Sequence, residues 1–370
     1  MESPLTPQTP RVPESDNTVS APSRLTELSL CALSCLSALY LSTVSQYALF
    51  DLLGILSLIL FAGAYSLLLD ASGLFTRVLP PVLAAAAMIL QAVFSGSWSF
   101  ISSQRLLQLL FALFCAAALY FCACGKAAKS VTFAATTTVL TVFTAAQAAV
   151  LIFQHYGALS LSVCKTAVFE STQAFGSFYT ALLAAAAGGL DANAGGGADF
   201  TAFLDEFEEM FVSSVRASLP SLAVSYCMLI AVLTLAVYKL LVRLSHAEER
   251  CLAGRQWGFS LSGVSVFFFY ISFAVYFVSS LFSNQTAFCA AFMNVTAILT
   301  YPFAWLGIKF LYHILYTKLH SRAGSAALIA VAFFILGGLF GAASVLFTLL
   351  AFVGASAQLS ALFRPSKPSA

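Results

Sequence analysis

Long apolar stretches separated by short polar breaks dominate the 370-residue sequence. A helix that crosses the hydrocarbon core of a bilayer needs about 20 apolar residues. Ten stretches come close to this length, and two close pairs leave the count between eight and ten spans. The expected helices are 25–45, 49–69, 78–96, 105–123, 131–153, 219–242, 261–282 and 288–316, and two more share residues 325–362. The pattern therefore predicts an all-α fold, a polytopic bundle of about ten transmembrane helices.

Glycines and small residues add detail to this pattern. The apolar stretch 325–362 is too long for one helix and short for two, and a glycine-rich break predicts a tight helical hairpin. A face of small residues in the first span indicates close packing against another helix of the same chain, or against another subunit. The glycines are Gly337, Gly338 and Gly341, and the small residues of the first span are Ser34, Ala38 and Ser42.

The polar positions divide the chain into five parts. Residues 1–24 are rich in Pro, Ser and Thr and predict a disordered tail, because they cannot bury enough apolar surface. Membrane helices occupy 25–153 and 218–363. Between them lies an acidic region at 154–217, and 364–370 form a short tail at the other end.

The acidic region has an amphipathic character. Its centre, 188–199, reads as a flexible Gly/Ala linker with amphipathic stretches on both sides. Residues 200–216 repeat apolar positions at helical spacing, and Asp199 is the expected N-cap. We expect a helix that lies on the outer surface with its acidic side chains in water. The alternative is an acidic lip that collects cations.

Composition narrows the classes of function. Apolar residues make up 60% of the chain and charged residues only 9%, so lipid must be the solvent for much of the surface. A net charge of +2 without a basic run excludes nucleic-acid binding. The nine cysteines form no CxxC pair and no zinc spacing. Hydrolase, metalloprotease and nucleotide-binding motifs are missing. Their absence predicts that the protein is not an enzyme and binds no cofactor.

Basic residues predict the orientation in the membrane. Lys and Arg concentrate in cytoplasmic loops of membrane proteins. With the N-terminus inside, 14 of the 17 basic residues fall on the inner side, and only Arg105, Lys165 and Arg216 fall outside. The sequence therefore predicts a multi-pass protein of the cell membrane, with both termini cytoplasmic and residues 154–217 outside.

Few polar side chains lie at membrane depth, where they are costly and often functional. Gln91, Gln147 and Asn294 fall within expected spans. Tyr301 and Trp305 follow Asn294 on the same helix, and an amide beside aromatic rings can line a small-molecule pocket. These three residues, Asn294, Tyr301 and Trp305, are the predicted ligand-binding residues. The alternative is that Asn294 makes an interhelical hydrogen bond.

Two stretches of the C-terminal half resemble the YybS-like family of uncharacterised polytopic bacterial membrane proteins. LPSLAVSYCMLIAVLTLAVYKLLVRL (219–244) resembles that family's helix with a proline at its start and a basic cluster at its end, here Pro220 and Lys239 with Arg243. NVTAILTYPFAWLGIKFLYHILYTK (294–318) resembles its asparagine-initiated helix. The resemblance covers roughly 200–365. The chain departs from the family at its C-terminus, which lacks the cluster of acidic and basic residues.

The resemblance implies a function in transport. The YybS-like family is distantly similar to the substrate-binding subunits of energy-coupling-factor vitamin transporters. It implies a protein that binds a small, vitamin-like molecule and works with an energy-coupling membrane protein and ATPases, since this chain has no nucleotide motif. The competing hypothesis is a non-transport envelope scaffold or regulatory membrane protein, which recruits partners through its acidic region and N-terminal tail.

Overall fold

The computed structural model describes residues 24–45, 48–49, 51–69, 73–96, 103–124, 129–188, 197–245, 259, 261–281, 287–335 and 343–362. The regular structure within these ranges is entirely helical, which confirms the all-α part of the prediction. The helices are α1 (Arg24–Leu39), continued by the π-helical turn η1 (Tyr40–Val44), α2 (Leu52–Leu68), α3 (Leu74–Phe94), α4 (Ser103–Cys124), α5 (Lys129–Tyr156), α6 (Leu161–Gly188), α7 (Gly197–Leu244), α8 (Gly263–Leu281), α9 (Ala287–Leu319), α10 (Arg322–Phe333) and α11 (Ala343–Leu362).

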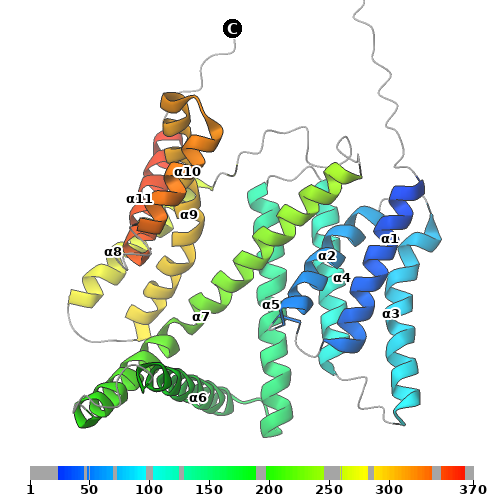
Figure 1. The fold of residues 1–370 in the computed structure, drawn as a ribbon, viewed down its shortest axis with the longest axis horizontal. Helices are drawn as coiled ribbons and strands as arrows, with labels where there is room; N and C mark the ends of the chain where they lie inside the picture. The colour runs from blue at the N-terminus through cyan, green and yellow to red at the C-terminus, as the bar shows by residue number, and fades with distance from the viewer. Residues whose placement is uncertain are drawn as a thin grey trace, which may run out of the picture.

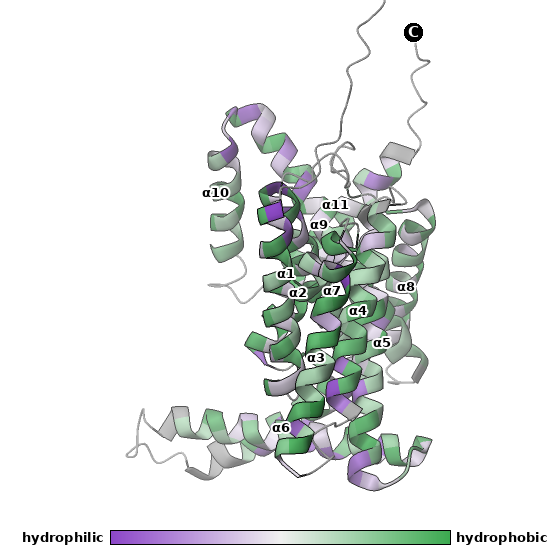
Figure 2. Cartoon of the chain, turned by 90° about the vertical axis from the view of Figure 1, so that its right-hand side faces the viewer, coloured by the Kyte–Doolittle hydropathy of each residue, from purple (hydrophilic) through white to green (hydrophobic). Residues whose placement is uncertain are grey.

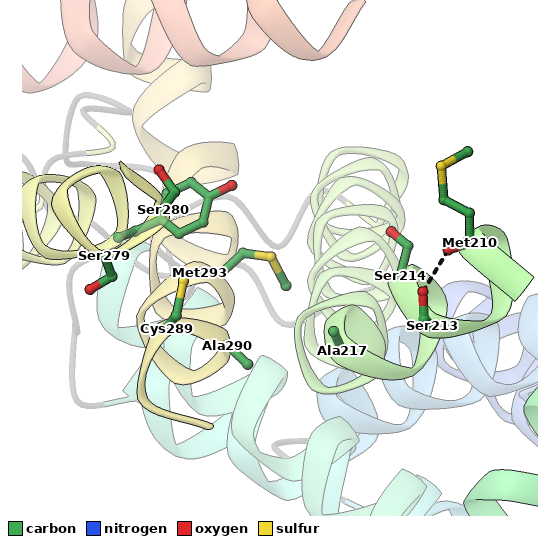
Figure 3. A pocket seen from close by; sticks show the side chains of 10 residues that line it. Met210, Ser213, Ser214, Ala217, Ser279, Ser280, Cys289, Ala290 and Met293 are labelled. Atoms are coloured by element: carbon green, nitrogen blue, oxygen red, sulfur yellow. Dashed lines mark hydrogen bonds between the residues drawn. The ribbon is translucent and has the colours of Figure 1, made fainter. Parts of the chain in front are cut away.

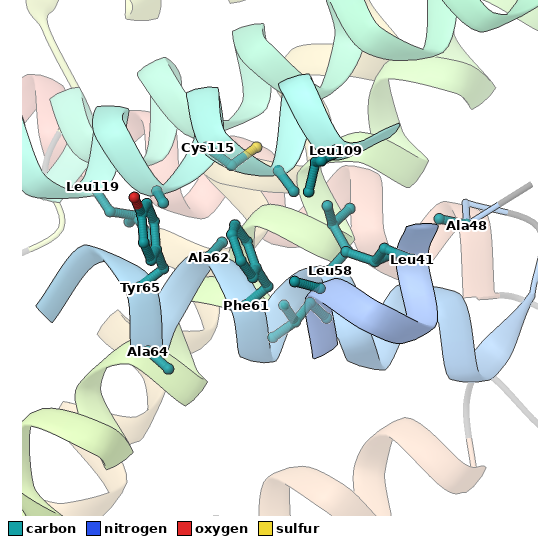
Figure 4. Packing of buried hydrophobic residues seen from close by; sticks show 14 of the residues in the cluster. Leu41, Ala48, Leu58, Phe61, Ala62, Ala64, Tyr65, Leu109, Cys115 and Leu119 are labelled. Atoms are coloured by element: carbon teal, nitrogen blue, oxygen red, sulfur yellow. The ribbon is translucent and has the colours of Figure 1, made fainter. Parts of the chain in front are cut away.

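Two groups of helices stand side by side (Figure 1). The N-terminal bundle contains α1–α5 and the second part of α7, and the C-terminal bundle contains α8–α11. Each bundle has its own apolar core. In the N-terminal core, Phe61 and Leu58 of α2 pack towards Leu109 of α4 and Leu41 of η1 (Figure 4).

Many large apolar side chains are exposed on the outside of both bundles. Hydrophobic residues accordingly predominate along these helices (Figure 2). Among the described residues, seven helices are long and apolar enough to cross a membrane. Three apolar helices are shorter: α2, α10 and the Ser344–Ser360 part of α11. Each of the ten predicted segments therefore contains an apolar helix, of which seven have the full length of a span. This exposed apolar surface is what a bilayer, rather than water, would cover.

The first break in the predicted pattern falls at Asp51, which caps α2. Its carboxylate accepts hydrogen bonds from the backbone N–H groups of Leu53 and Gly54, both at 3.2 Å. The hydroxyl of Tyr40 donates a third bond, at 2.8 Å. Residues 25–69 thus form two helices. The glycine-rich break at 337–341, the two terminal tails and residues 189–196 of the Gly/Ala linker lie outside the described residues.

The first span packs as its small residues predict. Ser34, Ala38 and Ser42 are all fully buried, and α1 with η1 lies against α2, α3 and α4 of the same chain. The intrachain interpretation of this small-residue face is confirmed.

Helix α7 differs from the prediction, because two expected segments form one helix of 48 residues. Its first part, residues 197–217, lies beside α6 in an antiparallel pair that we call the hairpin. Asp199 lies inside the first turn of this helix, so its predicted role as the N-cap is wrong. Pro220 lies inside the helix, where its missing N–H and its ring favour a bend. The apolar remainder of α7 crosses obliquely along the N-terminal bundle (Figure 1).

The two ends of the molecule differ. The start of α1 and the end of α11 lie at one end, which we call the terminal end, and the hairpin lies across the opposite end (Figure 1). Basic residues at helix ends, such as Arg243 of α7 and Lys318 of α9, lie at the terminal end. The arrangement places α6 and the start of α7 opposite the start of α1 and the end of α11. The predicted orientation in the membrane stays a prediction.

The C-terminal bundle is joined by a contact between glycines. A Cβ atom on Gly307 of α9 would lie 2.1 Å from the carbonyl oxygen of Leu350, and one on Gly354 of α11 would lie 2.0 Å from that of Phe303. Both distances are far below van der Waals contact. Only glycine therefore lets the backbones of α9 and α11 approach this closely.

Candidate binding pocket between α7, α8 and α9

Asn294 is buried where α9 meets the bend of α7. Its Oδ1 accepts a hydrogen bond from the backbone N–H of Ser221 at 2.9 Å. Its Nδ2 donates to the carbonyl oxygen of Ala217 at 2.8 Å, and also to that of Ala290 within α9. In a straight α-helix the Ser221 N–H and the Ala217 carbonyl would bond each other.

The Asn294 amide therefore bridges the hydrogen-bond ladder of α7 at the turn that contains Pro220. A proline removes one ladder bond and pushes neighbouring carbonyls apart. The side chain from α9 bonds a donor and an acceptor at that position. These contacts are the interhelical hydrogen bonds that were the alternative interpretation of Asn294.

The other two predicted residues lie apart from these contacts. Tyr301 is 47% exposed and Trp305 is 58% exposed, whereas Asn294 is 9% exposed. The Tyr301 ring lies 6.2 Å from that of Phe347 in α11. The structure thus brings Asn294 to α7 and leaves both rings on the surface of the C-terminal bundle, so a shared ligand contact of the three stays a prediction.

A pocket of about 480 Å³ lies beside Asn294, because its lining includes Ala217 and Ala290, whose carbonyls Asn294 bonds. Figure 3 shows the residues that line it. Three helices line it, with α7 on one side and the end of α8 and the start of α9 on the other. The lining residues are Met210, Ser213, Ser214 and Ala217 of α7, Tyr276, Ser279 and Ser280 of α8, and Cys289, Ala290 and Met293 of α9.

The polar groups of this lining are uncharged. The Ser213 hydroxyl donates to the Met210 carbonyl at 2.9 Å, and that of Ser280 donates to the Phe277 carbonyl at 2.7 Å. Both oxygens keep lone pairs that can accept. Within the described part of the chain, the hydroxyls of Ser214 and Ser279 have no hydrogen-bond partner. The pocket can therefore donate to and accept from a ligand.

The apolar part of the lining can adapt its shape to a ligand. Met210 and Met293 come from opposite sides of the pocket (Figure 3). Methionine has three rotatable bonds and a polarisable sulfur, so it adapts to irregular ligands. No residue of this pocket was predicted as a binding residue. The signal available in the sequence was two pairs of serines near the ends of predicted helices, Ser213 with Ser214 in 200–216 and Ser279 with Ser280 in 261–282.

A second group of polar residues is buried in the N-terminal bundle. Arg105, one of the three basic residues that the predicted topology places outside, is 7% exposed, and its guanidinium donates to Oε1 of Gln91 at 3.1 Å. Gln104 donates to the backbone carbonyl of Gln147 at 3.5 Å. Among the described residues, the side-chain amide of Gln147 has no hydrogen-bond partner, although it is 2% exposed. The sequence located Gln91 and Gln147 within spans, but it did not indicate that Arg105 is buried and bonds Gln91.

The acidic residues of the hairpin are partly used for its own structure. The Glu208 carboxylate accepts hydrogen bonds from Gln173, Ser177 and Thr180 of α6 at 2.8–3.1 Å. Among the described residues, no three His, Cys, Asp or Glu side chains are grouped to hold a metal ion. These contacts give Glu208 a structural role.

Comparisons with known proteins found no relative of this chain. No protein-family model, no curated protein and no solved structure matches the chain. The resemblance to the YybS-like family accordingly stays a prediction.

Proposed function

We propose that this chain is a cell-membrane protein that binds a small, uncharged, partly apolar molecule in the pocket between α7, α8 and α9. The observation that carries the proposal is the pocket itself. Its volume of about 480 Å³ falls within the range of small-molecule sites, roughly 300–1,000 Å³. Its lining combines serine hydroxyls with methionine and alanine surfaces and contains no charged side chain.

The position of the pocket favours a role in uptake. It lies at the end of the molecule opposite the start of α1 and the end of α11. The charge pattern predicts that the end with the pocket faces the outside. A ligand could thus enter from the outer face. The chain carries no nucleotide-binding motif, so energy for transport would come from partner ATPases through an energy-coupling membrane protein, as the YybS-like resemblance implies.

Thermal stabilisation tests the pocket directly. The purified protein in mild detergent is heated with a panel of vitamin-sized uncharged compounds, and at least one should raise the unfolding temperature by mass action. Ser279→Phe fills the pocket and should abolish the response. Ser360→Phe, at an exposed position on α11, serves as the matched control. A Ser279→Phe protein that responds like the wild type would rule out this pocket as the site.

Partner capture separates uptake from the competing scaffold role. The tagged protein is isolated from native membranes and its partners are identified by mass spectrometry. Stoichiometric recovery of an ATPase pair with a second polytopic protein supports the transport component. Recovery of envelope proteins instead, in the absence of any stabilising compound, supports the scaffold.

A further inference from the structure

We propose that the hairpin inserts its aromatic face into the adjacent leaflet of the bilayer, so that α6 and the start of α7 lie in the membrane interface. The proposal concerns the surface of the hairpin and does not depend on ligand binding in the pocket. It rests on the internal packing of the hairpin, on the distribution of its side chains and on its orientation relative to the spanning helices.

The hairpin is held together by specific contacts between its two helices. Glu208 of α7 bonds three side chains of α6. Arg216 donates to the hydroxyl of Thr172 at 3.3 Å, and its guanidinium lies 4.3 Å from the centre of the Phe169 ring. Gly176 leaves the space that the Val212 side chain occupies. These polar contacts fix which sides of the two helices face each other.

One side of the hairpin is a continuous layer of aromatic rings. Tyr179 of α6 stacks on Phe211 of α7 with ring centres 4.9 Å apart, and Phe207 lies 5.7 Å from Phe211. Phe175 and Phe203 extend the layer in both helices. At its edge, large side chains remain exposed: Phe175 51%, Phe178 64%, Leu182 55% and Phe203 57%.

The aromatic layer faces the spanning helices rather than the surrounding water. Met210 and Ser214 line the pocket that α8 and α9 complete, so this side of α7 faces the bundle. Phe203 and Phe207 precede Met210 by seven and three residues and share its side of the helix. Asp205 and Glu209 instead line a separate depression with Gln173 and Arg216, across the hairpin from the aromatic layer.

The hairpin also lies where an interface would be. It runs across the spanning helices and projects beyond them (Figures 1 and 2), so part of its aromatic layer lies beside the bundle rather than under it. A bilayer would cover the exposed apolar surface of the spanning helices, and the exposed side chains of the aromatic layer would add to that apolar surface. Helices with one apolar and one charged face bind in this way at the boundary between headgroups and acyl chains.

Tryptophan fluorescence tests the proposal. The native tryptophans are replaced (Trp98→Phe, Trp257→Phe and Trp305→Phe), and a single tryptophan is introduced by Phe203→Trp or by Glu209→Trp on the opposite side of α7. Both proteins are reconstituted into phosphatidylcholine vesicles with and without brominated acyl chains. Phe203→Trp should emit at shorter wavelength and be quenched several-fold more strongly by bromine. Glu209→Trp should instead be quenched by iodide in the water.

Three outcomes would overturn the proposal. Equal iodide quenching at both positions would place the aromatic layer in water. A Phe203→Trp signal shielded from bromine and iodide alike would indicate a protein partner, and its dependence on the protein-to-lipid ratio would identify a second copy. Should Phe203→Trp fail to fold, Phe178→Trp on α6 reports on the same layer, and absence of bromine quenching there has the same meaning.

Discussion

The Asn294 side chain bonds both a backbone donor and a backbone acceptor at the bend of α7. A side-chain amide offers a donor and an acceptor in one plane without a charge. It can therefore bond the N–H of Ser221 and the carbonyl of Ala217 together. A buried backbone group without a partner is expensive, particularly where lipid excludes water.

Replacing this amide should destabilise the protein. Asn294→Ala removes the partner of two buried backbone groups and should lower the free energy of unfolding by about 1–3 kcal/mol. Equilibrium unfolding in mixed detergent micelles measures the change. Thr300→Ala is the matched control on the same helix, since its hydroxyl bonds only the carbonyl of Thr296 one turn earlier. If both variants lose the same stability, the bridge to α7 contributes nothing.

At the scale of elements, the closest contact between helices is that of α9 with α11. The glycines that permit it, Gly307 and Gly354, come from distant parts of the sequence and face each other's backbone. The glycines that the sequence analysis emphasised were instead those near residue 337, which attract notice because they are close together. Packing glycines such as Gly307 and Gly354 are recognised only when the two helices are seen together.

Adding one methyl group at this contact should separate the helices. Gly354→Ala places a carbon where the Phe303 carbonyl and the Gly307 nitrogen already lie, and such overpacking costs about 1–3 kcal/mol. Gly324→Ala is the control, because its Cβ would meet only the Ser321 side chain, at 3.3–3.4 Å. The unfolding temperature should fall for Gly354→Ala alone. Equal temperatures for the two variants would contradict the close approach.

The sequence could predict where the apolar helices lie, because each needs a long apolar stretch. A span needs a fixed number of apolar residues, so the ten helices were located although their lengths were not. The continuity of α7 was missed because Pro220 and the change from acidic to apolar composition look like a boundary. The pocket was missed because serine, methionine and alanine carry no pattern until three helices bring them together.

At the scale of the whole molecule, the described residues form two bundles and the hairpin, and α7 contacts all three. That helix is ~70 Å long at 1.5 Å per residue, enough to lie in the hairpin and then cross the N-terminal bundle. Its contact with α9 connects the bundles beside the pocket. The same helix thus contributes to the hairpin, to the pocket and to the core of the N-terminal bundle.

The charge distribution makes the orientation testable. Epitope tags are placed at the N-terminus, at the C-terminus and after Ala158, between α5 and α6. The outer layers of the cell are removed and the cell membrane is left intact. Antibody should then bind only the tag after Ala158, and it should bind all three tags once the membrane is permeabilised. This result follows from the excess of basic residues on the side of the termini. Antibody binding to either terminal tag on intact cells would reverse the topology.

The amide bridge at the bend of α7 also sets an order for biosynthesis. Ser221 and Asn294 are 73 residues apart, and the chain is made from its N-terminus. α7 is therefore translated before the residue that bonds its bend. Chains that end within this interval lack the side chain that bonds the Ser221 N–H and the Ala217 carbonyl. We expect such chains to be degraded faster than chains that include α9, because a polar backbone group without a partner is costly in lipid.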